Sequence, residues 1–339
     1  MEKILTIVIP TYNMQDYLRR CLDSLIVPEE QMQHLEVLVV NDGSKDNSSV
    51  IAHKYQNKYP DTFRVIDKEN GNYGSCVNRG LKEATGKYIK ILDADDWFDN
   101  EAFIKYLMFL DDKTVDLILT PFVRLGVNNK TISIQKYSIP SYSIINSKEF
   151  TCSENLEMHA FTYRTGLLRD CKYTQSEGIS YTDTEWVMLP LPFVKSLIYV
   201  PLNVYSYFIG RAGQTMDHNV IVKRYGQLLQ IVSRLINYFS EIEIGDWQQY
   251  INNKIYNTIS GIYRMVLLEG KTKNFDAIVK FDKSIISSEF GLELNDLCID
   301  IRIKSNFVKN WRKRYKINDI NIFYRLFYRL LLVIRKLKH

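Results

Sequence analysis

Unbroken apolar runs alternate with amphipathic segments over the first hundred residues. Residues 4–10 and 36–40 are rich in Ile, Val and Leu, a pattern typical of strands buried on both faces of a parallel sheet. The segment between them spaces its apolar residues as a helix does: Leu18, Cys21, Leu22 and Leu25. The alternation continues with predicted helices over about 47–58 and 75–85 and predicted strands over 63–67 and 88–92. This order predicts right-handed βαβ units, and hence a mostly parallel sheet flanked by helices.

The pattern changes twice further along the chain. A helix from about residue 101 leads to a predicted strand at 116–120, and residues 121–145 suggest a meander of short strands that carries acceptor contacts. Short strands are also predicted at 197–201 and 204–208, and from 219 onward the spacing is helical. We therefore predict an α/β domain over 1–218, with halves 1–110 and 111–218, and a helical C-terminal domain over 219–339.

Three of the predicted parallel strands end in polar clusters. The first ends at Thr11-Tyr12, the second at Asp42-Gly43-Ser44, and the fourth in the acidic stretch Asp93 to Asp96. Ligands of open α/β sheets bind at the carboxyl ends of the strands. The three clusters therefore predict one site along one edge of the sheet, rather than three ordinary loops.

The acidic stretch brings three carboxylates together within four residues: Asp93, Asp95 and Asp96. Like charges this close repel one another, and their burial costs free energy. A divalent cation with a bound phosphate would make the arrangement favourable, because hard cations take oxygen ligands. The alternative is a solvated loop whose Asp residues cap the helix that begins near Asn100.

Four sequence blocks carry a family resemblance, and they occur in order over roughly the first 110 residues. They are Ile-Pro-Thr-Tyr-Asn (9–13), Val-Asn-Asp-Gly-Ser-Lys-Asp-Asn-Ser (40–48), the block from Gly71 to Ile89, and Leu-Asp-Ala-Asp-Asp (92–96). Together they resemble family-2 glycosyltransferases of the GT-A fold, of the type that builds bacterial cell-surface polysaccharides. The resemblance implies a GT-A (Rossmann-like) α/β domain followed here by the helical region.

The resemblance also implies roles for individual residues. Asp42 would accept a hydrogen bond from a uracil-like edge or the ribose, Asp93 would face the ribose and metal-bound water, and Asp95, with Asp96, would bind Mg²⁺ or Mn²⁺. The other residues implied beside the nucleotide are Pro10, Thr11, Tyr12, Asn13, Asn72, Gly74 and Asn78. Where the family commonly has a phosphate-contacting Arg, this chain has Val77, and Lys68 or Arg79 are the candidate substitutes.

The second half contributes a predicted general base. The segment 177–186 resembles the family's Glu-Asp motif at the start of a helix, with Thr182 where Glu is usual and Asp183 retained. Asp183 would take the proton of the acceptor hydroxyl; alternatively it only caps the helix, and Glu185 is the nearest rival. Arg211, in a loop that resembles the one closing over the donor, would pair with the diphosphate. His218 is either a further metal ligand or a surface histidine.

Charge is concentrated at the end of the chain. From Arg302 onward there are twelve Lys and Arg residues and only one acid, Asp319, whereas the whole chain carries a net charge of +5. Within 320–338 the residues Phe323, Leu326, Phe327, Leu330, Leu331, Ile334 and Leu337 share one helical face. A basic amphipathic helix of this kind predicts peripheral membrane contact, and the alternative is an ordinary packing helix. The other motifs offer no role for nucleic acid.

Composition narrows the cellular setting. The five cysteines form no Cys-x-x-Cys pair and are odd in number, as expected of reduced thiols in a cytoplasmic protein. The N-terminus enters a strand directly, which argues against a secretory signal, and no apolar run reaches the roughly 18 residues of a membrane span. We therefore expect a cytoplasmic protein, peripheral on the inner face of the membrane.

These observations combine into one functional hypothesis. The chain is expected to be an inverting, metal-dependent glycosyltransferase that moves a sugar from a nucleotide-diphosphate donor, a UDP-sugar, to a glycan or lipid-linked glycan acceptor. The alternatives are a nucleotidyltransferase of related fold and a catalytically silent, membrane-associated partner of another transferase.

Overall fold

The computed structural model describes residues 2–211, 214, 218–269, 275–297, 307–314 and 322–336. The chain divides into two compact units. The first, here called the α/β unit, comprises Met1–Ala212 and Glu243–Trp247; the second, the helical unit, comprises Gly213–Ile242 and Gln248–His339. The division falls close to the predicted boundary at residue 218.

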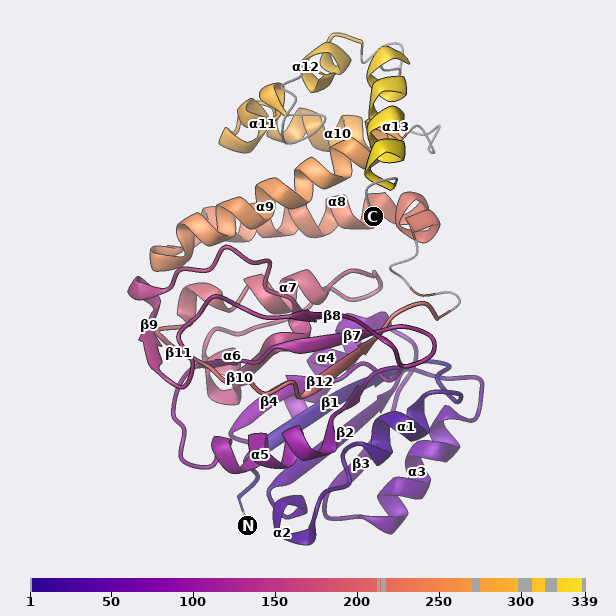
Figure 1. Ribbon diagram of the computed structural model, residues 1–339, viewed down its shortest axis with the longest axis vertical. Coiled ribbons are helices and arrows are strands. Elements are labelled where there is room, and N and C mark those ends of the chain that lie inside the picture. Colours follow the sequence, from indigo (N-terminus) through magenta and orange to yellow (C-terminus); the bar gives the residue numbers. More distant parts are fainter. Residues whose placement is uncertain are drawn as a thin grey trace. The chain divides into compact units, whose positions relative to one another are not determined.

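An eight-stranded sheet forms the core of the α/β unit, in the order β3-β2-β1-β4-β10-β6-β11-β9 (Figure 1). Its strands are β1 Leu5–Thr11, β2 Leu35–Asn41, β3 Phe63–Asp67, β4 Tyr88–Ile91, β6 Leu117–Leu119, β9 Ile144–Asn146, β10 Phe161–Arg164 and β11 Ser196–Tyr199. The first four pair in parallel, and β6 pairs in parallel with β11, whereas β10 and β9 run antiparallel to their neighbours. The predicted mostly parallel sheet is confirmed. It also spans both predicted halves of the domain.

Helices flank this sheet as the apolar periodicity predicts. They are α1 Leu18–Asp23, α2 Glu29–Met32, α3 Ser48–Lys58, α4 Asn72–Glu83, α5 Asn100–Leu110, α6 Thr165–Asp170 and α7 Asp183–Met188. Helix α3 packs on β2 and β3, and α4 packs on β1 and β2. Every residue of β1 and β2 is buried, which explains why these strands are continuous apolar runs.

A second, four-stranded sheet was not predicted. Its strands are β5 Trp97–Phe98, β7 Phe122–Leu125, β8 Thr131–Gln135 and β12 Tyr205–Phe208, in the order β5-β12-β7-β8. Strand β12 lies between β7, with which it pairs in parallel, and β5, with which it pairs antiparallel. This pairing brings residues 205–208 beside the strand that directly follows the acidic stretch.

The helical unit confirms the helical spacing predicted from residue 219. Its helices are α8 His218–Glu241, α9 Gln248–Tyr263, the π-helix Arg264–Leu268, α10 Asp276–Ile285, α11 Glu289–Glu293, α12 Phe307–Arg312 and α13 Ile322–Lys336. A buried ion pair between Arg312 and Asp282, with N···O 2.9 Å, joins α12 to α10. Among the described residues, no helix combines the length and apolarity needed to cross a membrane. Four cysteines are free thiols, and Cys298 lies outside the described residues.

Candidate active site

The polar ends of β1 and β2 are joined by side-chain hydrogen bonds. Asn13 has a left-handed backbone (φ 53°), and its side-chain oxygen accepts a hydrogen bond from Lys45 N at 2.8 Å. Asn13 N and Met14 N donate to the hydroxyls of Ser44 and Ser48. The first two polar clusters therefore form one rigid edge, with Thr11 buried and Tyr12 exposed beside it.

Asp42 is buried at this edge and already has a cationic partner. Its Oδ1 accepts hydrogen bonds from Lys68 Nζ at 2.6 Å and from Gly71 N at 2.9 Å. Lys68 Nζ also donates to Ser75 Oγ. The sequence offered Lys68 as a phosphate contact and Asp42 as a base contact, and the structure links the two in one ion pair.

The three carboxylates of the acidic stretch point to three different partners. Asp95 forms an ion pair with Arg211, with Nε···Oδ2 2.7 Å. Asp96 is buried, and its two oxygens accept hydrogen bonds from Phe208 N and the Tyr205 hydroxyl, both at 2.7 Å. Asp93 accepts a hydrogen bond from the Tyr73 hydroxyl at 2.7 Å.

Charge and burial shift the pKa values of these groups. Loss of solvation, followed by the charge of Asp95, raises the pKa of Asp93 to about 7. The same two causes raise the pKa of the Asp96 carboxyl well above its usual range. A nearby cation would reverse such shifts, since it favours the ionised carboxylate. The cluster therefore has the electrostatics of a cation site.

Helix α4 packs directly against the segment that leads to Asp183. A Cβ on Gly74 would lie 1.9 Å from the backbone oxygen of Ser176, so only glycine fits at this close approach. Asn78 binds the same segment through its side chain: Nδ2 donates to Gln175 O, and Oδ1 accepts from Gln175 N. Two residues that the resemblance placed beside the nucleotide thus also position the segment 175–177, whereas Asn72 is exposed with φ 68°.

Asp183 and Glu185 occupy very different environments in α7. Glu185 is completely buried, and its oxygens accept hydrogen bonds from Ser176 N at 2.6 Å and Ser176 Oγ at 2.7 Å. Asp183 is half-buried, and its charge contributes to the raised pKa values of both Asp93 and Tyr73, after the larger effect of lost solvation. Glu185 is therefore an internal anchor, while Asp183 lies near the acidic stretch.

Two buried groups near the acidic stretch were missed by the sequence reasoning. Lys90, on β4, is fully buried and donates to the carbonyl oxygens of His159 and Phe161 at 2.7 and 3.2 Å; burial lowers its pKa to about 7. His159 lies in the 3₁₀ turn Met158–Ala160 before β10, and burial, with the charges of Lys90 and Arg124, lowers its pKa to about 3. The pattern of apolar residues around Lys90 and His159 predicts secondary structure but does not identify either residue as part of a site.

The candidate metal ligands include one of these missed residues. Asp93, Asp96 and His159 each bring one ligand atom within 4.8 Å of the others. Asp95, the first metal ligand implied by the resemblance, is instead paired with Arg211. His218 belongs to the helical unit, where it is paired with Glu269. The donor set of two carboxylates and an imidazole suits a divalent cation such as Mn²⁺.

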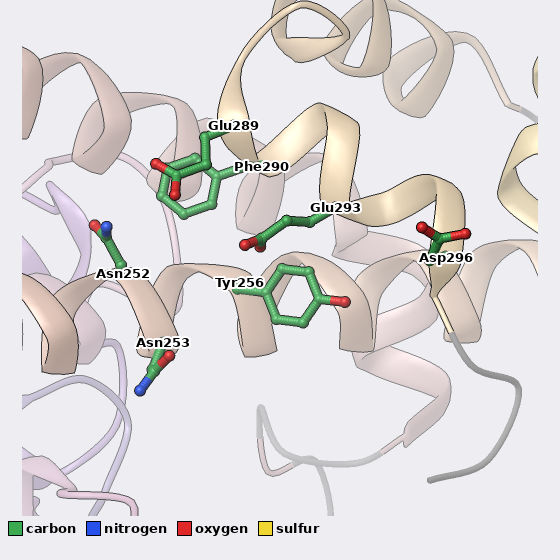
Figure 2. Close-up of a pocket in the computed structure, with 7 residues that line it drawn as sticks. All are labelled: Asn252, Asn253, Tyr256, Glu289, Phe290, Glu293 and Asp296. Carbon is green, nitrogen blue, oxygen red and sulfur yellow. The ribbon is translucent and has the colours of Figure 1, made fainter. Parts of the chain in front are cut away.

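A separate cavity of about 420 Å³ lies within the helical unit (Figure 2). Asn252 and Tyr256 of α9 lie opposite Glu289, Phe290 and Glu293 of α11, and Asn253 and Asp296 complete the lining. None of these residues belongs to the motifs described above. We therefore place the candidate active site in the α/β unit.

Comparison with known proteins matches the same part of the chain. The model of the family described as Glycosyl transferase family 2 matches residues 6–171. The uncharacterized glycosyltransferase MG025 of Mycoplasma genitalium is 38% identical over 136 residues, which cover 40% of this chain and 44% of that protein. The poly(ribitol-phosphate) beta-N-acetylglucosaminyltransferase TarS of Staphylococcus aureus is 28% identical over 215 residues, which cover 62% of this chain and 36% of TarS. The matches thus span less than half of these relatives' length.

Solved structures show the same fold. The crystal structure of S. aureus TarS 1–349 in complex with UDP-GlcNAc matches with a TM-score of 0.62 and 20% identity, over 83% of this chain and 81% of that one. A mannosyltransferase from Pyrobaculum calidifontis in complex with GDP-Man and Mn²⁺ matches with a TM-score of 0.51 and 15% identity, over 86% and 83%. The chain therefore has the GT-A fold, and its residues 6–171 form a glycosyl transferase family 2 domain.

Proposed function

We propose that this chain transfers a sugar, with inversion, from a UDP-sugar to a glycan or lipid-linked glycan of a bacterial surface polymer. The observation that carries the proposal is the position of Asp183, a half-buried carboxylate whose charge acts on Asp93 at the edge of the sheet. Support for the donor comes from TarS, which was solved with UDP-GlcNAc and with UDP. Support for the acceptor class comes from relatives named as poly(ribitol-phosphate) transferases.

Each part of the site has a defined task in this reaction. Asp183 removes the proton of the acceptor hydroxyl as that oxygen attacks the sugar carbon. Asp42, Thr11 and Tyr12 bind the uridine at the ends of β1 and β2. Carboxylates of the acidic stretch would hold Mg²⁺ or Mn²⁺, and such an ion would stabilise the negative charge on the departing diphosphate. Arg211 exchanges Asp95 for a diphosphate oxygen when the donor binds.

A panel of UDP-sugars, with Mn²⁺ and with chelator, tests this function. Release of UDP with a suitable acceptor is expected with Mn²⁺, and strongly reduced release with chelator. Release of pyrophosphate from a nucleoside triphosphate would instead show the nucleotidyltransferase. Absence of any turnover, alone or with acceptor lipids, would favour the silent partner.

The base assignment has its own test. We expect Asp183→Asn to lower kcat by about 10²- to 10⁴-fold, because that is the usual contribution of a general base, while UDP binding changes little. The matched control is Asp170→Asn, since Asp170 is an exposed acid at the end of α6 and should leave kcat unchanged. Equal kcat for Asp183→Asn and wild type would remove Asp183 from this role.

The site of action is a further part of the proposal. We place the enzyme in the cytoplasm, peripheral on the inner face of the membrane, where a lipid-linked acceptor would be presented. Helix α13 supports this because Phe323, Leu326, Phe327 and Leu330 are all exposed on it. An ordinary packing helix would bury that face.

A further inference from the structure

Lys90 is a buried cation without a counter-charge. It lies in β4, just before the acidic stretch, and its side chain is fully buried. Its Nζ donates to two backbone oxygens, those of His159 at 2.7 Å and Phe161 at 3.2 Å, and it forms no ion pair among the residues that the structure describes. Burying an unpaired ammonium is costly, and natural proteins accept such costs mainly at functional sites. Lys90 is therefore expected to serve the site that follows it.

The two backbone oxygens lie where the pairing of β4 with β10 has ended. The last pair of this antiparallel ladder toward the acidic stretch joins Ile89 to Tyr163. The same register would set His159 opposite Asp93, but the ladder does not extend that far. The side chain of Lys90 thus takes the place of ladder hydrogen bonds and holds β4 to the 3₁₀ turn before β10.

The turn that Lys90 holds contacts a tyrosine of the smaller sheet. The His159 ring stacks on Tyr207 with centroids 4.3 Å apart, and it meets the Tyr205 ring edge-on at 4.8 Å. Lys90 Nζ itself lies 5.7 Å from the centroid of the Tyr205 ring, within the range of a cation–π interaction. Tyr205 therefore contacts both the turn and the cation that holds the turn in place.

Tyr205 in turn holds both ends of the acidic stretch. Its hydroxyl accepts a hydrogen bond from Asp93 N at 3.1 Å and donates one to Asp96 Oδ2 at 2.7 Å. The contacts thus form a closed circuit, which leaves β4 at Lys90, passes through the 3₁₀ turn and Tyr205, and returns to the chain at Asp93. Side chains fixed from several directions in this way are preorganised, as a precise site requires.

We propose that Lys90 is a positioning residue of this transferase, and that it fixes the acidic stretch through His159 and Tyr205. Because it is fully buried, it acts without touching donor or acceptor. A methionine at this position would remove the buried charge, but it would leave both backbone oxygens without their donor and the turn free to shift. The inference rests on the proposed function only for the reaction that is measured, since the order of the acidic stretch can be measured without turnover.

Hydrogen exchange of the full chain, resolved to single amides, tests the positioning directly. In Lys90→Met the amide of Asp93 should exchange roughly fivefold faster than in wild type, which is the effect of losing about one hydrogen bond. The matched control is Lys87→Met. Lys87 also donates to a backbone oxygen, that of Asp111 at 3.3 Å, and lies 5.8 Å from the Tyr88 ring, but it precedes the opposite end of β4. Its replacement should leave the exchange of Asp93 unchanged.

Steady-state kinetics with a UDP-sugar test the consequence for turnover. We expect Lys90→Met and Tyr205→Phe each to lower kcat by about 10- to 100-fold, the usual effect of removing a residue that supports a site from behind, with little change in UDP affinity. The double variant should lose no more than the worse single variant, because both residues act through one chain of contacts. Lys87→Met should keep the wild-type kcat.

The outcomes separate this inference from the proposed function. Wild-type exchange at Asp93 in a folded Lys90→Met protein overturns the inference, and so do losses of kcat that multiply in the double variant. If Lys90→Met does not fold, Tyr205→Phe decides: faster exchange at Asp93 supports the route through the hydroxyl, and wild-type exchange overturns it. Faster exchange in a protein that turns over no nucleotide sugar keeps the inference and rejects the function. Wild-type exchange in both variants, with full release of UDP, does the reverse.

Discussion

Three aspartates within four consecutive positions each have different partners. Asp95 meets Arg211, Asp96 meets Tyr205 and a backbone N–H, and Asp93 meets Tyr73. The sequence identifies the acidic cluster, because the carboxylates are adjacent along the chain. Partners that lie more than a hundred residues later, such as Tyr205 and Arg211, are set by the pairing of β12 and become visible only in the fold.

At the residue scale, burial of His159 predicts a pH-dependent stability. The folded protein holds the pKa of His159 at about 3, whereas an unfolded histidine titrates near 6.5. The folded-state pKa is the lower one, so its stabilising contribution is complete above pH 6.5 and is lost as the pH falls toward 3. Below pH 6.5 the unfolding free energy of wild type should fall, relative to His159→Gln, by about 1.4 kcal/mol per pH unit.

Urea unfolding at several pH values between 7.5 and 5, in chelator, measures this difference. His53→Gln serves as the control, because the His53 side chain is 42% exposed, whereas His159 is buried, and its removal should not change the pH dependence in the same way. Parallel curves for wild type and His159→Gln would show that the imidazole accepts a proton in the folded protein.

At the element scale, the N-terminal part of α4 positions the segment that leads to Asp183. Gly74 allows the backbone of Ser176 to approach. The side-chain amide of Asn78 donates to the backbone oxygen of Gln175 and accepts from its backbone N–H. The block from Gly71 to Ile89 identifies Gly74 and Asn78 as important residues, but it does not reveal that they contact residues 175 and 176. The contact partner lies a hundred residues away, in a stretch without periodicity, so the resemblance alone assigned both residues to the nucleotide.

Substitution of Gly74 should therefore damage activity through the position of α7. In Gly74→Ala the new Cβ would lie 1.9 Å from the Ser176 carbonyl oxygen. The backbone of either α4 or the segment around Ser176 must therefore shift. We expect a loss of about 1–3 kcal/mol in stability, as for other overpacked sites, and a fall in kcat that exceeds any change in UDP affinity. Thermal unfolding and steady-state kinetics measure the two effects.

The matched control for this substitution is Gly261→Ala. A Cβ at Gly261 meets nothing within 4 Å, and the position lies inside α9, so alanine should be neutral or stabilise by up to about 1 kcal/mol. Equal behaviour of the two variants would show that the close approach at Gly74 has no role in placing Asp183.

The sequence predicts more of the first sheet than of the second for a physical reason. Strands β1, β2 and β4 are buried on both faces and are separated by amphipathic helices, so local pattern alone reveals their type and order. Strand β12 instead joins β7 from about eighty residues earlier. The register of this pairing depends on tertiary packing. The positions of Tyr205, Tyr207 and Arg211 around the acidic stretch depend on it in turn.

At the scale of the whole molecule, the helical unit adds an exposed apolar surface on α13. Helix α13 is held on its own unit through its polar side: Arg325 Nε donates to Leu267 O at 3.1 Å, and Asn310 Nδ2 donates to the Tyr324 hydroxyl at 2.6 Å. Arg325 thus serves partly as an attachment within the unit. The apolar side faces outward, with Phe323 74% and Leu330 55% exposed.

This orientation predicts membrane binding that depends on the apolar side of α13. Removing two leucines in Leu326→Ser/Leu330→Ser should weaken binding to anionic vesicles by roughly 10- to 100-fold, because each leucine contributes up to about 2 kcal/mol when buried. UDP binding should stay unchanged. Ile132→Ser is the matched control, since Ile132 is an equally exposed apolar residue of β8. Vesicle sedimentation at two salt concentrations measures the effect. Unchanged sedimentation of the double variant would contradict membrane binding and would assign the exposed face to self-association. Analytical ultracentrifugation would then detect that self-association.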